Sequence, residues 1–372
     1  MINVGIIGCG YWGAKHARVV SESAQACLHS VADLDPEKVK AITTKYDTVR
    51  GLTDFQALLD DPEIQAVIIA TPASTHYNLA RQALAAGKHV MVEKPLSVYP
   101  QECQQLIDLA NQEKLTLMVG HTFEYHPRVE ALRKLIRSNE LGDLYYLDAA
   151  RLNLGLYQRD VNVIHDLSPH DISIMIYVLE KRPIEVATRG YSIVHGGVVD
   201  LAYIEYRFDN GLVANSRVSW LAPKKVREMT VVGSKKMVVY DDIDDANPIQ
   251  LFEKGIVPPH ETEKFGDWKF AYQYGEAVSV PVRGEEPLKT EIEHFIDCLK
   301  TGKKPLTDGI NGRTVVSVLH AAQLSLRNNG RPQTVEYYDL LNRNPVVRSG
   351  KPLKVGAIAR KNVAQPAASS SN

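Results

Sequence analysis

The sequence predicts an α/β protein in which an N-terminal doubly wound parallel sheet precedes a C-terminal α+β region with a large, mostly antiparallel open sheet. Over the first 120 residues, short runs of β-forming residues alternate with amphipathic helical stretches, which is the pattern of βαβ units. A strand-rich region from Ile184 to Tyr240 follows, in which tight turns replace the helices. The chain has 372 residues, more than one hydrophobic core usually serves, so we expect two domains.

The elements of the N-terminal half follow from these apolar runs. Short runs without alternation are typical of parallel strands that are buried on both faces, and we expect such strands at Val4–Gly8, Leu28–Ala32, Ala66–Ala70, His89–Val92 and Leu117–Gly120. Helical periodicity predicts the intervening helices at Ala14–Ser21, Pro36–Tyr46, Thr75–Ala86 and Pro100–Lys114.

For the second half, the sequence predicts a meander of antiparallel strands with helices segregated from it. Asn210-Gly211 between β-rich segments is a strong hairpin signal. We further expect a long strand at Leu144–Asn153 and helices at Arg128–Asn139, His165–Glu180, Leu288–Thr301 and Gly309–Arg327. The domain limits that we predict are 1–124, 125–345 and a tail, 346–372, whose Ala- and Ser-rich end we expect to be disordered.

Composition excludes several classes of partner. The formal net charge of −1 gives no electrostatic reason for nucleic acid or an anionic membrane as the partner. No apolar run approaches the roughly 20 residues that span a bilayer, and the N-terminus lacks the pattern of a signal peptide. The four cysteines show no C-x-x-C spacing, so we expect reduced thiols in a cytoplasmic protein without a metal site.

A glycine-rich turn follows the first predicted strand. Gly8, Gly10 and Gly13 match G-x-G-x-x-G, and Tyr11 and Trp12 lie where the next helix begins. In a dinucleotide-binding (Rossmann) turn, the first glycine allows the tight turn, the second lets the pyrophosphate approach and the third packs helix on strand. The helix N-terminus then supplies amides and a partial positive charge. The alternative, a glycine-rich turn without a ligand, is disfavoured by this strand–turn–helix context.

Asp33 indicates which dinucleotide binds. It ends the second predicted strand at the spacing of about 20 residues expected for a ribose-binding carboxylate. Its charge would repel a 2′-phosphate, and no basic residue precedes Lys38 to bind one. The sequence therefore predicts NAD as the cofactor of domain 1–124.

Two further motifs resemble the Gfo/Idh/MocA family, the group of glucose–fructose oxidoreductase and inositol dehydrogenase. They are Ala70-Thr71-Pro72-Ala73-Ser74-Thr75-His76 and Val90-Met91-Val92-Glu93-Lys94-Pro95, each at the end of a predicted strand. The resemblance covers the chain to about Tyr337. It implies that Thr71, Pro72, His76, Glu93 and Lys94 lie at the cofactor, that Lys94 is catalytic and that the bond before Pro95 is often cis. Without that context, Lys94 would read as a surface lysine.

The resemblance also implies an Asp-x-x-x-His on the first helix of the catalytic domain, which Asp166 and His170 provide. Four residues apart on a helix, the two side chains share one face. His165 and Asp171 are weaker candidates, and Asp171 fits a packing or capping role as well. A histidine meets the need for a base near neutrality without perturbation, while Lys94 can stabilise a developing alkoxide. We expect Asp166 to orient His170 or to pass the proton onward; whether Lys94 or His170 takes the proton first stays open.

Three stretches, 120–127, 151–155 and 162–171, resemble the branch of UDP-N-acetylglucosamine and UDP-N-acetylglucosaminuronate 3-dehydrogenases. The reaction that this implies is oxidation of the C3 hydroxyl to a ketone, ahead of transamination in polysaccharide biosynthesis. Tyr125 offers a ring face to sugar or uracil, Arg151 a bidentate partner for diphosphate or carboxylate, and Asn153 contacts to hydroxyls. Alternatively, Arg151 and Asn153 lie on a solvated strand face, as we expect for Lys224, Lys225 and Arg227.

Two other functions remain open. One is a dehydrogenase of a free polyol or simple sugar, such as inositol, glucose or a glucoside. The other is a catalytically silent NAD-binding regulator, against which the intact Lys94, Asp166 and His170 argue. Because the second face of the C-terminal sheet needs a cover, the resemblance implies a homodimer or homotetramer formed through that sheet.

Overall fold

The N-terminal part is built on a parallel sheet, as the sequence predicts, but the sheet has six strands, because Arg50–Leu52 adds a short edge strand to the five that we expected. In the computed structural model, which describes residues 1–155, 157, 161–194, 196–257, 271–338 and 345–346, the strand order is β3-β2-β1-β4-β5-β6. The order reverses between β1 and β4, and ligands of such sheets bind at this point, outside the carboxyl ends of the strands. The strands are β1 (Ile2–Ile7), β2 (Ala26–Ala32), β3 (Arg50–Leu52), β4 (Ala66–Ile69), β5 (His89–Glu93) and β6 (Leu117–Gly120).

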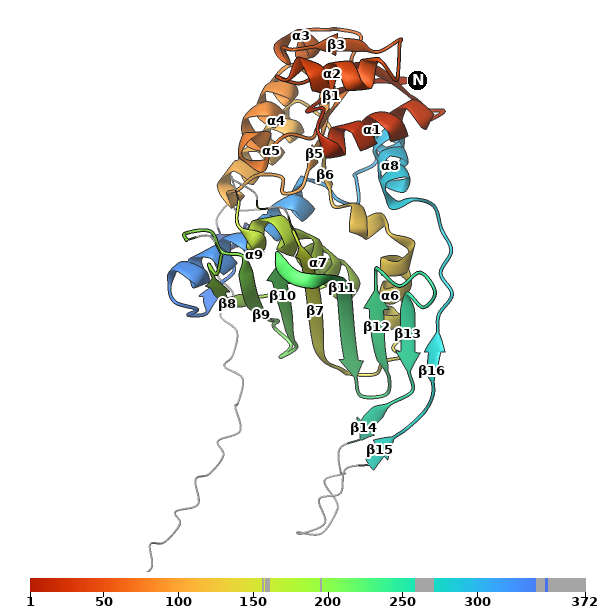
Figure 1. Ribbon diagram of the computed structural model, residues 1–372, viewed down its shortest axis with the longest axis vertical. Coiled ribbons are helices and arrows are strands. Elements are labelled where there is room, and N and C mark those ends of the chain that lie inside the picture. The colour runs from red at the N-terminus through yellow and green to blue at the C-terminus, as the bar shows by residue number, and fades with distance from the viewer. Residues whose placement is uncertain (156, 158–160, 195, 258–270, 339–344, 347–372) are drawn as a thin grey trace, which may run out of the picture.

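Helices cover both faces of this sheet because its central strands are apolar; β4 and β5 are buried almost completely (Figure 1). The covering helices are α1 (Tyr11–Glu22), α2 (Pro36–Thr43), α3 (Gln56–Leu59), α4 (His76–Ala85) and α5 (Pro100–Gln112), with a short 3-10 helix η1 (Ala73–Thr75) before α4. Each helix follows a strand in the chain, so the helix N-termini gather at the edge where a ligand binds.

The C-terminal part contains a nine-stranded mixed sheet in the order β16-β13-β12-β11-β7-β10-β9-β8-β17. Its pairs are antiparallel except β7 with β10. The strands are β7 (Leu144–Leu154), β8 (Glu185–Tyr191), β9 (Leu201–Arg207), β10 (Val213–Ser219), β11 (Leu221–Gly233), β12 (Met237–Asp241), β13 (Ile249–Phe252), β16 (Ala277–Ser279) and β17 (Gln333–Thr334). Small two-stranded sheets pair β14 (Gly255–Val257) with β15 (Ala271–Gln273) and β18 (Tyr337–Tyr338) with β19 (Pro345–Val346).

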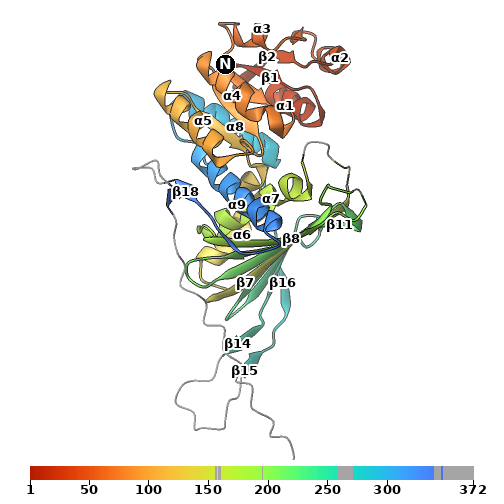
Figure 2. The same ribbon diagram turned by 90° about the vertical axis from the view of Figure 1, so that its left-hand side faces the viewer.

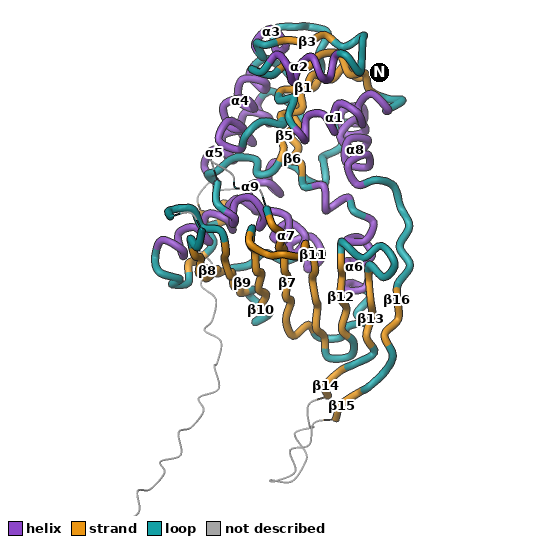
Figure 3. The backbone as a smooth tube through the Cα atoms, in the orientation of Figure 1, coloured by secondary structure: helices purple, strands orange, loops and turns teal. Residues whose placement is uncertain are grey.

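The hairpin predicted at Asn210-Gly211 joins β9 to β10, with Gly211 at φ +84° and Phe208 N–H donating to the carbonyl oxygen of Leu212. Figure 2 shows helices on one side of the large sheet, and Figure 3 shows how long β7 and β11 run through its middle. The helices of this part are η2 (Thr122–Tyr125), α6 (Pro127–Arg137), α7 (Val163–Leu179), α8 (Pro287–Thr301) and α9 (Gly309–Arg327).

One helix of the predicted second domain packs against the first. The sequence assigns α8 to the second domain, but Leu288, Ile292, Phe295 and Ile296 pack in the same core as β1 and α1 of the first. The chain therefore returns to the N-terminal part before it ends. The helix α8 connects the two parts a second time, in addition to the segment at η2. The predicted tail lies outside the described residues from 347 on. Within the described residues, no helix is both long and apolar enough to cross a membrane.

Candidate active site

The glycine-rich turn between β1 and α1 has the geometry of a dinucleotide cradle. Gly8 adopts φ +98°, which disfavours any side chain there. A Cβ on Gly13 would lie 1.8 Å from the carbonyl oxygen of Gly8, so only glycine lets the helix start this close to the strand. A Cβ on Gly10 would meet nothing within 4 Å, which leaves open space above the turn.

Asp33 sits at the end of β2 and is fixed by backbone amides. Its Oδ2 accepts a hydrogen bond from Cys9 N–H at 2.7 Å and its Oδ1 accepts one from Asp35 N–H at 2.9 Å. The carboxylate thus faces a cavity of about 880 Å³, which Gly8, Gly10, Asp33, Thr71 and Pro72 help to line. Lys38 also lines it, but Asp35 neutralises that charge at 3.7 Å. These groups fit the adenosine and pyrophosphate of NAD.

His76, which the sequence places among the cofactor-binding residues, lies behind this cavity. It is 1% exposed, and its ring nitrogens lie 2.7 Å from the carbonyl oxygen of Pro95 and 2.9 Å from that of Thr71. Burial lowers the pKa of His76, and both carbonyl groups oppose that shift. His76 therefore fastens the Thr71–Pro72 loop to the Lys94–Pro95 loop, instead of facing the cavity.

The motif Glu93-Lys94-Pro95 follows β5, and the Lys94–Pro95 peptide bond is cis. Glu93 is buried; its Oε1 lies 2.7 Å from Nε2 of His16, and its Oε2 accepts the amide of Lys94. Burial alone would raise the pKa of Glu93, but His16 and Lys94 lower it overall, so the carboxylate stays ionised. Sequence reasoning missed His16, which lies one turn into α1 on the helix's buried face.

Lys94 reaches from the first part of the protein into the second. Its Nζ donates to the main-chain carbonyl oxygen of Asp166 at 2.9 Å and lies 3.8 Å from Asp166 Oδ1. Burial lowers the pKa of Lys94, an effect that Asp166 and Glu93 partly oppose. Lysines brought towards neutrality in this way can exchange protons near physiological pH.

Asp166 does not hold His170 as the sequence suggested. Its Oδ2 accepts a hydrogen bond from Nε1 of the buried Trp220 at 2.9 Å, and its Oδ1 faces Lys94. The indole sits at the junction of β10 and β11 and fixes the carboxylate toward the lysine. The expected Asp166–His170 couple is thus replaced by a Trp220–Asp166–Lys94 chain.

His170 lies one turn further along α7, with its ring edge-on to Phe123 at 5.1 Å between centroids. Burial lowers its pKa well below the usual value, and Lys94, Arg151 and Arg227 lower it further. The expectation of an unperturbed histidine is therefore wrong: three nearby cations and burial keep this imidazole neutral. A neutral ring is the form that can accept a proton.

A second cavity, of about 250 Å³, lies at the junction of the two parts, where His170, Phe123, Glu93 and Trp12 are among its lining residues. Trp12 and Glu93 come from the first part, and Phe123 and His170 from the second. This cavity thus brings Trp12 of the glycine-rich turn and His170, the predicted catalytic histidine, into one lining.

Of the predicted substrate-binding residues, Tyr125 is in the core. It is 9% exposed, packs with the apolar residues of α8, and its hydroxyl lies 3.0 Å from that of Thr307. The prediction that its ring faces a ligand is wrong, because η2 turns the side chain inward toward α8. Asn153 is half-buried, and its Oδ1 has no hydrogen-bond partner among the described residues.

Arg151 is committed to an internal ion pair. Its Nε and Nη2 bind Oδ1 of Asp171 at 2.8 and 2.7 Å, and both side chains are buried. Burial raises the pKa of Asp171, while Arg151 opposes that shift. Asp171 thus has the packing role that the sequence left open. In His165, the other weaker candidate, the Nδ1 atom lies 3.2 Å from Nε2 of Gln323.

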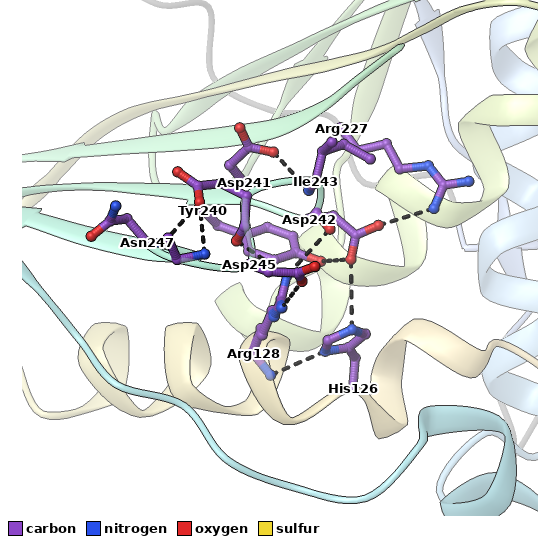
Figure 4. A network of polar contacts seen from close by, with 11 residues as sticks. His126, Arg128, Arg227, Tyr240, Asp241, Asp242, Ile243, Asp245 and Asn247 are labelled. Atoms are coloured by element: carbon purple, nitrogen blue, oxygen red, sulfur yellow. Dashed lines mark hydrogen bonds and ion pairs between the residues drawn. The ribbon is translucent and has the colours of Figure 1, made fainter.

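The sequence placed Arg227 on a solvated face, but the structure places it in the wall of the smaller cavity. It stands opposite Arg151 in the β11–β7 pairing, and its Nη1 lies 3.0 Å from Oδ2 of Asp242 (Figure 4). No motif marks Arg227 or Asp242, because the register of two strands that are far apart in the chain brings them to the cavity. His121 is a further buried imidazole near Lys94 and Glu93, with its pKa lowered to about 4 mainly by burial.

The comparisons with known proteins agree with this geometry. Residues 2–121 match the domain described as "Oxidoreductase family, NAD-binding Rossmann fold", and residues 129–239 match the "GFO/IDH/MocA C-terminal domain". The chain is 29% identical over 327 residues to UDP-N-acetylglucosamine 3-dehydrogenase from Acidithiobacillus ferrooxidans, covering 88% of this chain and 96% of that protein. It is 25% identical over 339 residues to inositol 2-dehydrogenase from Rhizobium meliloti, covering 87% and 97%.

A solved structure of UDP-N-acetylglucosamine 3-dehydrogenase GnnA from Acidithiobacillus ferrooxidans superposes with a TM-score of 0.74 at 26% identity, covering 89% of this chain and 99% of that one. Both halves of the chain thus match one family, and the cradle of Gly8 to Gly13 with Asp33 matches its cofactor. The protein belongs to the Gfo/Idh/MocA family of NAD-dependent oxidoreductases.

Proposed function

We propose that this protein oxidises a secondary hydroxyl, at C3, of a nucleotide sugar of the type UDP-N-acetylglucosamine or its uronate. The observation that carries the proposal is the meeting of Lys94 with Asp166 across the two parts of the protein, with His170 one turn away beside the cavity. The 29% identity to a UDP-N-acetylglucosamine 3-dehydrogenase supports the choice of substrate.

When bound, NAD accepts a hydride from the sugar carbon. The protein's own groups handle the proton and the charge. Neutral His170 takes the hydroxyl proton as the C–H bond breaks, and the ammonium of Lys94 donates a hydrogen bond to the oxygen as it acquires negative charge. That negative charge raises the pKa of His170 at the moment of transfer, since an opposite charge nearby favours the imidazolium.

Asp166 acts through Lys94. The indole of Trp220 holds one carboxylate oxygen, and the other faces the lysine ammonium at 3.8 Å. This arrangement holds the Lys94 ammonium at Asp166 and limits how far burial lowers the pKa of Lys94.

We further propose that two copies pair through the open face of the large sheet. Tyr146 on β7 and Tyr203 on β9 point to the face opposite the helices and are 43% and 48% exposed. Exposed aromatic side chains on a wide sheet are typical of interfaces. Light scattering tests this by measuring the molar mass of the native protein and of the Tyr203→Asp variant. A native multimer that dissociates in the variant supports the pairing. A monomeric native protein contradicts it.

The test of the reaction is a substrate panel. UDP-N-acetylglucosamine, its uronate, N-acetylglucosamine, glucose and myo-inositol are each incubated with enzyme and NAD, and NADH is followed by absorbance, with NMR of the product to locate the ketone. Oxidation of a UDP-sugar at C3 supports the proposal. Turnover of inositol but of no nucleotide sugar overturns it in favour of the second candidate, a polyol dehydrogenase, which the 25% identity to an inositol 2-dehydrogenase supports.

A further inference from the structure

The wall of the smaller cavity carries an arginine that the reaction itself does not use. Arg227 lines the same cavity as His170, and its side chain is 35% exposed. Within the described ranges, its hydrogen-bonded partner is Asp242, through Nη1 alone. The guanidinium also lies 6.0 Å from the ring of Phe123. Its Nε and Nη2 are therefore left to bind something that enters the cavity.

Asp242 holds this arginine in place and is itself held from several sides. Its Oδ1 accepts a hydrogen bond from the hydroxyl group of Tyr240 at 3.1 Å and lies 3.6 Å from Nε2 of His126 (Figure 4). Arg128 donates to its main-chain oxygen at 3.2 Å. The Asp242 carboxylate is only 9% exposed. Such a support fixes the direction of the Arg227 guanidinium before any ligand binds.

The opposite wall contributes a second cation. Lys15 of α1 lines the cavity, and its Nζ lies over the rings of Tyr11 and Trp12 at 4.6 and 5.2 Å. Lys15 lowers the pKa of Tyr11, and Lys225 and Arg227 lower it further, so cations approach this tyrosine from both parts of the protein.

Each carboxylate of the lining contacts a basic side chain other than Lys15. Glu93 has His16 at 2.7 Å, Glu286 has Arg18 at 2.5 Å, and Asp242 has Arg227. Within the described residues, Lys15 has no ion-pair partner, and Arg227 binds Asp242 through Nη1 alone, so these two cations keep donors for an anion that enters the cavity. A neutral polyol has no group that would pair with them, whereas an anionic sugar has.

We infer that Arg227, positioned by Asp242, binds an anionic group of the substrate, a diphosphate or a carboxylate carried by the sugar, with Lys15 assisting from the opposite wall. This inference rests on the proposed function, of which it specifies the substrate class. Arginine suits either group because its planar donors match two oxygens at once.

The kinetic test compares Arg227→Met with Lys224→Met, which removes the same charge from an exposed position on the same strand. At saturating NAD, Arg227→Met is expected to raise KM for UDP-N-acetylglucosamine or its uronate by about 10- to 100-fold, the loss expected for a charged hydrogen bond. It should leave KM for NAD unchanged. Lys224→Met should match the native enzyme, and Arg227→Lys should recover part of the loss. Equal effects of Arg227→Met and Lys224→Met would overturn the inference.

A binding test separates this inference from the proposed reaction. UDP and glucuronate are each titrated by calorimetry into the NADH-loaded native enzyme, Arg227→Met, Asp242→Asn and Lys224→Met. Binding of UDP that weakens in the first two variants assigns the diphosphate to Arg227, and the same result with glucuronate assigns the carboxylate. Either result upholds the inference even if no nucleotide sugar is oxidised. If a UDP-sugar is oxidised but neither anion depends on Arg227, the inference fails and the proposed function stands.

Discussion

Lys94 Nζ donates a 2.9 Å hydrogen bond to the main-chain carbonyl oxygen of Asp166, which joins the loop after β5 to the first turn of α7. The two residues are 72 positions apart in the chain. Lys94 follows the six-stranded sheet of the N-terminal part, and Asp166 belongs to the C-terminal part with the nine-stranded sheet. The site therefore exists only where both parts meet, and its support can be tested residue by residue.

Trp220→Phe should lower kcat by about tenfold, because it removes a hydrogen bond to a charged group, worth roughly 1.5–3 kcal/mol, and leaves Asp166 free to turn from Lys94. KM for NAD should not change. Tyr206→Phe is the matched control, since it removes a buried hydroxyl that bonds Ser216 instead. Steady-state kinetics measure both, and equal kcat values in the two variants would show that Trp220 plays only a packing role.

In the pH profile of kcat/KM, the midpoint of the acidic limb should lie well below the usual pKa of an imidazole. Burial and three cations lower the pKa of His170, so its neutral form persists as pH falls and protonation stops activity only at lower pH. Arg227→Met removes one of these cations, so its acidic limb should move to higher pH. The measurement is a pH–rate profile for both enzymes; a limb at or above the usual histidine pKa in the native enzyme would contradict this assignment.

Asp33→Ser should raise KM for NAD by at least about tenfold, because two amides hold this carboxylate at the cofactor cavity and a charged hydrogen bond is lost. The preference for NAD over NADP should shrink, since the carboxylate that repels a 2′-phosphate is then missing from the cavity. Paired kinetics with NAD and NADP give the ratio. An unchanged ratio would mean that Asp33 does not choose the cofactor.

Arg151→Met should destabilise the protein by about 3–5 kcal/mol, the range for breaking a buried ion pair and leaving one charge alone. The partner left behind is Asp171, 4% exposed at its side chain. Arg151→Met with Asp171→Leu should regain much of that stability, because no buried charge remains. Urea denaturation measures the change. A stable Arg151→Met variant with a raised substrate KM would return Arg151 to the role of a substrate ligand.

Local sequence patterns were sufficient to predict the fold class and the cofactor site. Gly8, Gly13 and Asp33 are identified by spacing because their roles depend on one strand–turn–helix unit and the strand after it. The same holds for the turn at Gly211, where the short segment 208–212 joins β9 to β10.

The substrate side could not be predicted in the same way. Whether Tyr125 points outward depends on α8, which lies more than 160 residues later and covers that ring. Arg227 reaches the cavity because β11 pairs with β7, and Asp242 follows from the next strand. These are contacts between distant segments, and hydrophobic periodicity does not encode them.

The most direct test of the shared site is NADH formation from UDP-N-acetylglucosamine by the native enzyme and by Lys94→Ala. We expect turnover by the native enzyme and a loss of at least about 100-fold in kcat in the variant, because Lys94 stabilises the reacting oxygen. NAD binding, followed by calorimetry, should persist in the variant. Full activity of Lys94→Ala on every accepted sugar would contradict the account.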